Sequence, residues 1–114
     1  MGRMRHHALI VTGTHHAAMR RAHKKARKIF TKRVSNLIPS RMNGYVSFLI
    51  PPDGSKEDWP ESDDFDRRRE RFQSWLYEHG YTDGSSPFDW IEVEYGGDGP
   101  LITPGEAVGD DIPF

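Results

Sequence analysis

The sequence predicts an α+β domain whose elements follow the order β-α-β-β-α-β. Three observations predict this class. Four short segments carry β-branched or alternating apolar residues, which is typical of strands. Two longer segments repeat their apolar residues every three or four positions, as one face of a helix does. The chain has 114 residues, which is enough for one domain of this kind.

The first strand and the first helix are predicted in residues 7–12 and 15–31. Residues 7–12 are mostly apolar and end at Gly13. Thr14 can cap the helix that follows, because its hydroxyl can accept from a free amide of the first turn. We expect one face of this helix to be buried, formed by Met19, Ala22, Ala26, Ile29 and Phe30.

The two middle strands are predicted in residues 34–38 and 45–50. The first is the weaker candidate, and Pro39 tells against a central position because proline has no N–H to donate to a sheet. Asn43 and Gly44 tolerate positive φ and favour a tight hairpin turn between the two strands. If the weaker strand does not form, three strands and two helices remain, which is still an α+β fold.

The second helix is predicted to begin near Ser62 and to reach about His79. Ser62 can cap it, and the acidic residues of its first turn suit the positive end of the helix dipole. Acids precede bases over residues 63–71, and we interpret this cluster as i,i+4 ion pairs that support the helix rather than as a reactive site. The alternative is that one or two of its arginines bind a protein. The expected apolar face comprises Phe65, Phe72, Trp75 and Leu76.

The last strand is predicted in residues 89–95, where apolar and polar residues alternate. Such alternation indicates a strand with one buried side and one wet side. We expect the buried side to carry Ile91, Val93 and Tyr95 and the wet side to carry Trp90, Glu92 and Glu94.

This order of elements is that of the ferredoxin-like split βαβ fold, an antiparallel sheet with two helices on one face. The predicted domain covers residues 1–96. Residues 97–114 are acidic and rich in glycine and proline and show no helical or strand period, so we expect a C-terminal tail there.

Charge is segregated along the chain, although the formal net charge is only −1. Residues 1–50 hold 11 Lys and Arg and no acid, whereas residues 51–114 hold all 17 acids and five Lys and Arg. The mean hydropathy is −0.76 and the sequence has no long apolar run, so we expect no membrane span and no signal peptide. We therefore expect a cytoplasmic protein that does not bind membranes. The lack of cysteine excludes disulfides and thiolate metal sites.

Three segments of the chain are distinctive together. The first is residues 43–59, in which Pro52-Asp53-Gly54-Ser55-Lys56-Glu57 precedes Trp59. The second is the start of the second helix, where acidic residues are followed by basic ones. The third is residues 83–93, where Asp83-Gly84-Ser85-Ser86 leads to Trp90-Ile91-Glu92-Val93. These segments resemble small uncharacterised accessory proteins of tailed phages and prophages of proteobacteria, and the resemblance covers roughly residues 6–97. It implies a non-enzymatic protein that binds and modulates a host bacterial protein, such as an inhibitor of a defence system (anti-CRISPR-like). It transfers no site residue.

Two charged surfaces compete as the binding surface. The basic residues 20–32 can contact an acidic protein or, as the alternative, the phosphates of a nucleic acid. The acidic stretch 53–111 can instead imitate nucleic acid toward a basic groove of a host protein or of a protein–nucleic-acid complex. Exposed aromatic residues can anchor either contact. The candidate partner-binding residues are Arg20, Arg21, Lys24, Lys28, Trp59, Trp90, Glu92 and Glu94.

The sequence predicts no catalytic residues, no metal and no cofactor. The histidine pairs at residues 6–7 and 15–16, with His23, lack the converging spacing of a zinc site. Residues 12–14 join a strand to a helix start, where amides can bind an anion, but a single glycine is a weak signal and an ordinary helix start is the stronger interpretation. An exposed edge of the antiparallel sheet would allow a homodimer.

Overall fold

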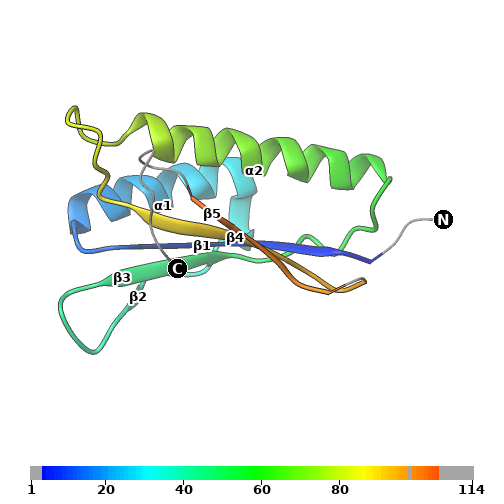
Figure 1. Cartoon of the computed structure of the whole chain (residues 1–114), viewed down its shortest axis with the longest axis horizontal. Coiled ribbons are helices and arrows are strands. Elements are labelled where there is room, and N and C mark those ends of the chain that lie inside the picture. The colour runs from blue at the N-terminus through cyan, green and yellow to red at the C-terminus, as the bar shows by residue number, and fades with distance from the viewer. Residues whose placement is uncertain (1–3, 98, 106–114) are drawn as a thin grey trace.

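The computed structural model describes residues 4–97 and 99–105 of the chain, and these form two layers, a sheet and a pair of helices (Figure 1). The predicted α+β class, with an antiparallel sheet and two helices, is confirmed. In chain order the elements are β1 (His6–Gly13), α1 (His16–Phe30), the short 3₁₀ helix η1 (Thr31–Arg33), β2 (Ile38–Pro39), β3 (Val46–Ile50), α2 (Pro60–Glu78), β4 (Asp89–Tyr95) and β5 (Leu101–Pro104).

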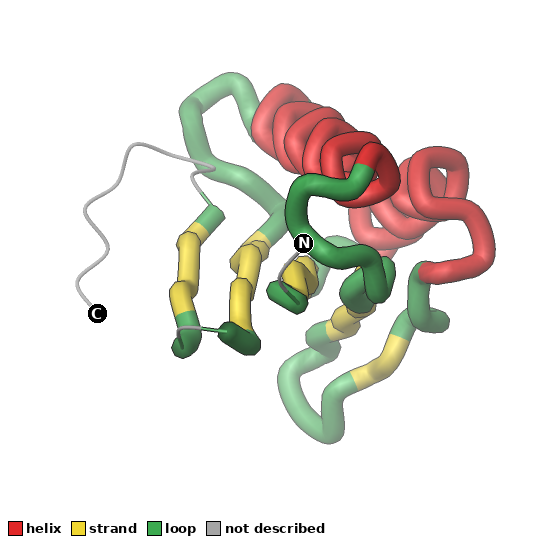
Figure 2. The backbone as a smooth tube through the Cα atoms, turned by 90° about the vertical axis from the view of Figure 1, so that its right-hand side faces the viewer, coloured by secondary structure: helices red, strands yellow, loops and turns green. Residues whose placement is uncertain are grey.

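The sheet has five strands in the order β2-β3-β1-β4-β5, and every neighbouring pair is antiparallel. Both helices lie on the same side of it (Figure 2). The number of strands is larger than predicted, because β5 forms within residues 97–114, where we expected only a tail. Its four residues pair with β4, with Thr103 opposite Glu92 and Ile102 opposite Val93. A strand of four residues between glycines and prolines is too short to show a clear alternation of apolar and polar residues, so it could not be recognised in the sequence. Residues 106–114 of the expected tail lie outside the described residues.

Helix α1 packs on the sheet through the face that the sequence predicts. Its buried residues include all five expected positions and also Ala18. The predicted cap was wrong, because His15 rather than Thr14 caps the helix: its Nδ1 accepts from the backbone N–H of Ala18 at 3.0 Å. The helix ends at Thr31, whose φ of 62° takes the backbone out of the helical region.

The β2–β3 hairpin is shorter than predicted on its first side. Strand β2 contains two residues rather than residues 34–38, and it forms one edge of the sheet, where Pro39 is tolerated. The preceding Val34 is buried and Leu37 packs against the core instead of extending the strand. The Asn-Gly turn is confirmed, since Asn43 and Gly44 have φ values of 63° and 68°.

Helix α2 begins two residues before the predicted cap. Trp59 occupies the cap position and Pro60 the first turn, where proline's missing N–H costs nothing, so the prediction of Ser62 as cap was wrong. Ser62 is instead buried within the first turn. No helix in the part of the chain that the structure describes is long and apolar enough to cross a membrane.

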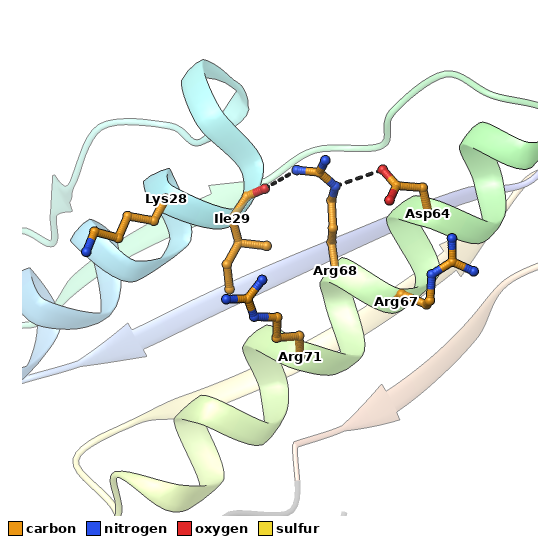
Figure 3. A pocket seen from close by; sticks show the side chains of 6 residues that line it. All are labelled: Lys28, Ile29, Asp64, Arg67, Arg68 and Arg71. Carbon is orange, nitrogen blue, oxygen red and sulfur yellow. Dashed lines mark hydrogen bonds and ion pairs between the residues drawn. The ribbon is translucent and has the colours of Figure 1, made fainter.

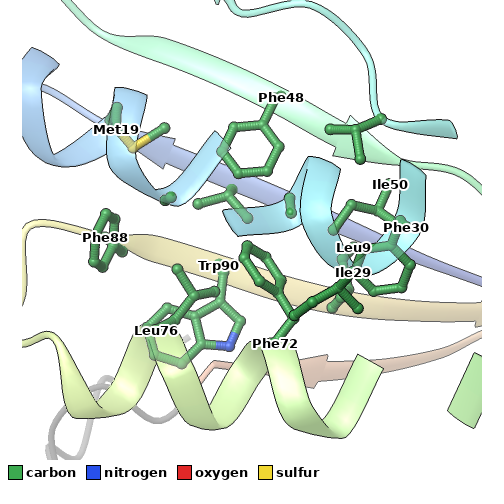
Figure 4. Packing of buried hydrophobic residues seen from close by; sticks show 14 of the residues in the cluster. Leu9, Met19, Ile29, Phe30, Phe48, Ile50, Phe72, Leu76, Phe88 and Trp90 are labelled. Carbon is green, nitrogen blue, oxygen red and sulfur yellow. The ribbon is translucent and has the colours of Figure 1, made fainter. Parts of the chain in front are cut away.

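The core lies between the helices and one face of the sheet, and aromatic rings dominate it (Figure 4). Phe72 of α2 is at its centre, with ring centroids 6.0 Å from Phe30 and 6.2 Å from Phe48. The ring of Trp75 is nearly parallel to that of Phe72, with the two centroids 6.4 Å apart. The small chain thus fills its core with a few large rings that join both helices to β3.

Candidate functional site

The four candidate cations of α1, namely Arg20, Arg21, Lys24 and Lys28, are all exposed. They lie on the side of the helix away from its buried residues, because the apolar positions recur at three- and four-residue spacing. Residues 20–33 carry eight Lys and Arg and no acid. This part of the helical layer is therefore strongly and uniformly positive.

Helix α2 extends this positive surface with two cations that the sequence interpretation had assigned to helix support. Lys28 and Ile29 of α1 line a shallow groove of about 250 Å³ together with Asp64, Arg67, Arg68 and Arg71 of α2 (Figure 3). Arg67 and Arg71 are exposed. We call six of the exposed cations of the two helices the basic helical surface, namely Arg20, Arg21, Lys24, Lys28, Arg67 and Arg71.

Two further arginines at the junction of α1 and α2 hold the helices together instead of facing a partner. Arg68 donates to Asp64 at 2.8 Å and to the backbone carbonyl of Ile29, which ties α2 to the end of α1. The guanidinium carbons of Arg68 and Arg33 lie 5.4 Å and 5.0 Å from the centroid of the Phe65 ring. Such cation–π contacts contribute about 0.5–1 kcal/mol each at exposed sites.

The structure reverses the predicted faces of β4. Strand β1 pairs with β4 so that Val11 is opposite Trp90 and Leu9 is opposite Glu92. Since Leu9 and Val11 are fully buried beneath the helices, Trp90, Glu92 and Glu94 lie on the helix-covered face. The expectation that Glu92 and Glu94 are on the open, wet face was wrong.

Glu92 has partners in β1 and in α2, whereas the partners of Glu94 lie in β1 and just before it. Glu92 Oε2 lies 3.3 Å from His7 Nδ1 and 3.8 Å from Arg69 Nε. Glu94 Oε1 lies 3.6 Å from His7 Nδ1 and 3.7 Å from Arg5 Nε. Arg69, Glu92 and Glu94 expose 4%, 21% and 22% of their side chains. We call Arg5, His7, Arg69, Glu92 and Glu94 the interlayer ion cluster. Its charges are largely satisfied within the chain, which leaves little for a partner.

The two candidate tryptophans occupy different environments. Trp90 is 8% exposed, and its indole N–H donates to Gln73 Oε1 at 3.3 Å, while the amide of Gln73 donates to Glu92 at 3.0 Å. Trp90 is therefore part of the core and not an anchor for a partner. Trp59 is 44% exposed at the start of α2, with Lys56 Nζ 5.9 Å from its ring centroid. It lies roughly 12 Å before Arg67 along the helix axis at 1.5 Å per residue.

Five of the six histidines, all of which lie within the described residues, have hydrogen-bond partners: His7, His15, His16, His23 and His79. His16 Nε2 donates to the carbonyl of Gly44 at 2.7 Å and His23 Nε2 to that of Ser35 at 2.8 Å, since a carbonyl can only accept. These contacts tie α1 to the turn between β2 and β3 and to the segment before β2. Within residues 4–97 and 99–105, no group of three or more His, Asp or Glu side chains is arranged to hold a metal ion.

The strand-to-helix junction at residues 12–14 is filled by packing and offers no room for an anion at Gly13. A Cβ at this position would lie 2.4 Å from the carbonyl oxygen of Pro87 and 2.9 Å from Met19 Sδ. Thr12 is also engaged, with its hydroxyl 2.8 Å from that of Ser47. The glycine is thus needed for the close approach of β1 to the segment before β4.

Gly13→Ala is expected to lower the free energy of unfolding by about 1–3 kcal/mol, as overpacking does elsewhere. The clash with Pro87 involves backbone, which cannot move aside as a flexible side chain can. Urea denaturation followed by circular dichroism measures the loss. Gly54→Ala tests the cost of backbone strain alone, because Gly54 has a φ of 84° and no atom near its Cβ position. Equal stability of wild type and Gly13→Ala would contradict the close approach.

Among the described residues, the carboxyl group with a clearly lowered pKa is that of Asp83, in the loop between α2 and β4. The hydroxyl of Ser85 and then its backbone N–H donate to Asp83 at 2.6 Å and 2.9 Å, and they lower the pKa of its carboxyl group. The interaction orders an exposed turn and involves no residue of the basic helical surface.

Comparison with protein-family models, with curated proteins and with solved structures finds no match. The candidate site therefore depends on the geometry of this chain alone. The structure brings Lys28 together with Arg67 and Arg71, separates Trp59 from them, and removes Trp90, Glu92 and Glu94 from the accessible charged surface. The four-residue spacing of Arg67 and Arg71 was the sequence signal for their common face.

Proposed function

We propose that this protein is a non-enzymatic accessory protein that binds an acidic surface of a host bacterial protein through the basic helical surface. The observation that carries the proposal is the run of eight cations without an acid in residues 20–33, extended by exposed Arg67 and Arg71 of the neighbouring helix. The inward position of Glu92 and Glu94 argues against the acidic stretch as the binding surface. The resemblance to phage and prophage accessory proteins stays a prediction, and with it a bacterial cytoplasm and a defence effector as the setting.

The charge pattern of α2 favours a protein partner over a nucleic acid. Exposed Glu61, Asp63, Glu70 and Glu78 lie on the same helix as Arg67 and Arg71. A phosphate backbone is uniformly negative and would be repelled by these carboxylates. A protein surface can place acids against the cations and bases against the carboxylates, which gives electrostatic complementarity and specificity.

Nucleic acid is the second candidate, and one observation favours it. Lys28, Arg67 and Arg71 line a common groove. The carboxylate that also lines this groove, Asp64, is already paired with Arg68. Several cations that converge on one groove can neutralise neighbouring phosphates and release counterions.

We also propose that the architecture is the ferredoxin-like split βαβ fold with one strand added. The order β2-β3-β1-β4, with β3 between β1 and β2, supports this assignment. Strand β5 then extends the sheet beyond β4 and covers an edge that would otherwise be free.

A comparison of matched charge-reversal variants tests the basic helical surface. Lys24→Glu with Lys28→Glu is expected to weaken capture of a specific host protein at least tenfold, because two attractive contacts become repulsive. The control is Arg41→Glu with Lys56→Glu, which makes the same change in net charge at exposed positions outside the two helices. Quantitative affinity capture from host lysate at two salt concentrations measures the difference. Equal losses in the two pairs would show that net charge, and not this surface, determines capture.

The same variants decide between protein and nucleic acid. Titration of DNA and RNA with the protein over a range of salt concentrations gives the number of phosphates neutralised from the slope of log K against log[salt]. The proposal predicts weak binding that the control pair reduces as much as the α1 pair does. A steep slope that only the α1 pair abolishes would establish the nucleic-acid alternative in place of a protein partner.

A further inference from the structure

The face of the sheet opposite the helices carries a continuous apolar patch. Ile10 in the central strand is paired with Leu49 on one side and with Ile91 on the other. One row along, Val93 is paired with Ala8 and with Ile102. Because side chains alternate along strands and the neighbours Leu9 and Val11 face the helices, all of these residues lie on the open face. We call Ile10, Leu49, Ile91, Val93 and Ile102 the open sheet patch.

Nothing among the described residues covers this patch, and both helices lie on the other side of the sheet (Figure 2). Ile10, Leu49 and Ile102 expose 40%, 37% and 58% of their surface. The patch contains no charged residue. Contiguous apolar areas of this kind on a soluble domain mark interaction sites, whereas singly scattered apolar residues do not.

We propose that the open sheet patch binds the same patch of a second copy of this chain, so that two sheets pack face to face in a symmetric dimer. A nucleic acid would require cations on this face, and the patch has none. An uncharged patch is compatible with itself, which a two-fold interface demands because the same surface occurs on both sides. Stacked antiparallel sheets bury alternate side chains in this way at a separation of about 10 Å.

The dimensions of the sheet fit this occupant. Five strands at about 4.8 Å spacing give a face about 20 Å wide. Strands β1 and β4 have eight and seven residues, so at about 3.3 Å per residue the face is on the order of 20 Å long at its centre, and it is shorter at β2 and β5. Stable dimers bury about 800 Å² of accessible surface on each partner. The accessible surface area of a corrugated face of this size is of the same order as the area that one partner of a stable dimer buries.

Shape and polarity along the strands select an antiparallel arrangement of the two copies. A two-fold axis perpendicular to the strands, between the rows of Ile10 and Ala8, brings protruding Ile10 over Ala8 of the other copy. Ala8 is 7% exposed, and its methyl group is shorter than the side chains of its neighbours Ile10 and Val93 on the same face. The same operation places Asp89, at one end of β4, over Tyr95 of the other copy, at the other end of that strand. The ring of His6 lies 5.1 Å from that of Tyr95 and is therefore beside this carboxylate. A histidine ring can donate a hydrogen bond to that carboxylate.

The dimer leaves both helical layers outside, each with a free basic helical surface. Two such surfaces in one particle would strengthen binding to a repeated or dimeric partner through effective concentration. Formation of the dimer does not depend on the proposed function, since the two surfaces lie on opposite sides of the sheet.

Sedimentation equilibrium of the full chain over about two decades of protein concentration tests the proposal. We expect a concentration-dependent dimer for wild type and a monomer for Ile91→Lys, which places a charge at the centre of the patch. Ile102→Lys, at an exposed position of the edge strand, is expected to weaken the dimer at least tenfold while circular dichroism shows an unchanged fold. Lys24→Glu on the opposite surface serves as the control and should not change the dissociation constant.

The orientation has its own test. Asp89→Lys should weaken the dimer, and Asp89→Lys with His6→Asp should restore it, because the exchanged pair meets again across the two-fold axis. A monomeric wild type at every concentration would overturn the proposal. A dimer that forms only after removal of residues 106–114 would also overturn it for the full chain, since that segment would then be the occupant. A dimer that Ile91→Lys and Ile102→Lys both leave intact would show that another surface is used.

Discussion

Phe72→Ala is expected to lower the free energy of unfolding by about 3–5 kcal/mol, as removal of a fully buried phenylalanine does in other cores. Phe72 is 0% exposed and contacts rings from α1, from β3 and from its own helix. Its removal leaves a cavity at the point where both layers meet. A domain of this size has a total stability of roughly 5–15 kcal/mol, so this single change removes a large part of it.

Chemical denaturation of the variant, followed by tryptophan fluorescence, measures the loss. Tyr77→Ala is a suitable control, because Tyr77 lies on the same helix but is 58% exposed. It is expected to change stability by less than about 0.5 kcal/mol. A loss below about 1 kcal/mol for Phe72→Ala would mean that α2 does not pack on the sheet as described.

The two helices could be predicted because their apolar residues keep one face over several turns. Met19, Ala22 and Ala26 have the spacing of α1 and are all buried. Phe72 and Leu76 do the same in α2. Cap positions were less predictable, since His15 and Trp59 occupy them in place of the hydroxyl residues that usually do. Local hydrogen bonds and the fixed φ of Pro60 determined those ends more than residue preference did.

The face of β4 could not be predicted from its own residues. One side carries Ile91, Val93 and Tyr95, and burial of that side is the ordinary expectation for a strand. Partial burial of Glu92 and Glu94 is acceptable because Arg69 and Arg5 place positive charge beside them and the ring of His7 lies within hydrogen-bond distance of Glu92. These partners come from two remote segments, so the pairing exists only in the folded chain.

The role of Arg67 and Arg71 in the candidate site also depends on contacts between segments that are remote in the sequence. The sequence interpretation paired acids and bases along α2 at i,i+4 spacing, and the Asp64–Arg68 pair is confirmed at 2.8 Å. Arg67 and Arg71, however, are exposed and line a groove with Lys28 of the other helix. Only the packing of α2 beside α1 shows that these arginines extend a basic surface.

The reversal of β4 has consequences for both sides of the sheet. It places two carboxylates against the helices, which removes negative charge from the accessible surface near α2. It also leaves Ile91 and Val93 on the open face, next to Ile10 and Ala8. The way β4 pairs with β1 therefore creates part of the open sheet patch and also keeps two carboxylates from the accessible surface beside the basic helical surface, on the opposite side of the sheet.

Arg69→Met is expected to destabilise the protein by about 2–4 kcal/mol. Arg69 is 3% exposed, donates to Asp66 and lies 3.8 Å from Glu92. Removal of one partner from a buried ion pair costs about 3–5 kcal/mol elsewhere. We expect somewhat less here, because Glu92 keeps the amide of Gln73 at 3.0 Å and His7 at 3.3 Å, and Asp66 can reach water.

A double-mutant cycle separates loss of the ion pair from loss of packing. Methionine keeps much of the volume of Arg69 but none of its charge, so Glu92 is left without its buried cation. If that uncompensated charge causes the loss, Arg69→Met with Glu92→Met should recover most of it, since an apolar pair of similar volume is often as stable as a buried ion pair. Arg67→Met, at the exposed position two residues earlier, should cost less than about 0.5 kcal/mol. If Arg69→Met and Arg67→Met had equal stability, Arg69 could not be the buried cation that allows Glu92 to face the helices, and the assignment of that face would have to be revised.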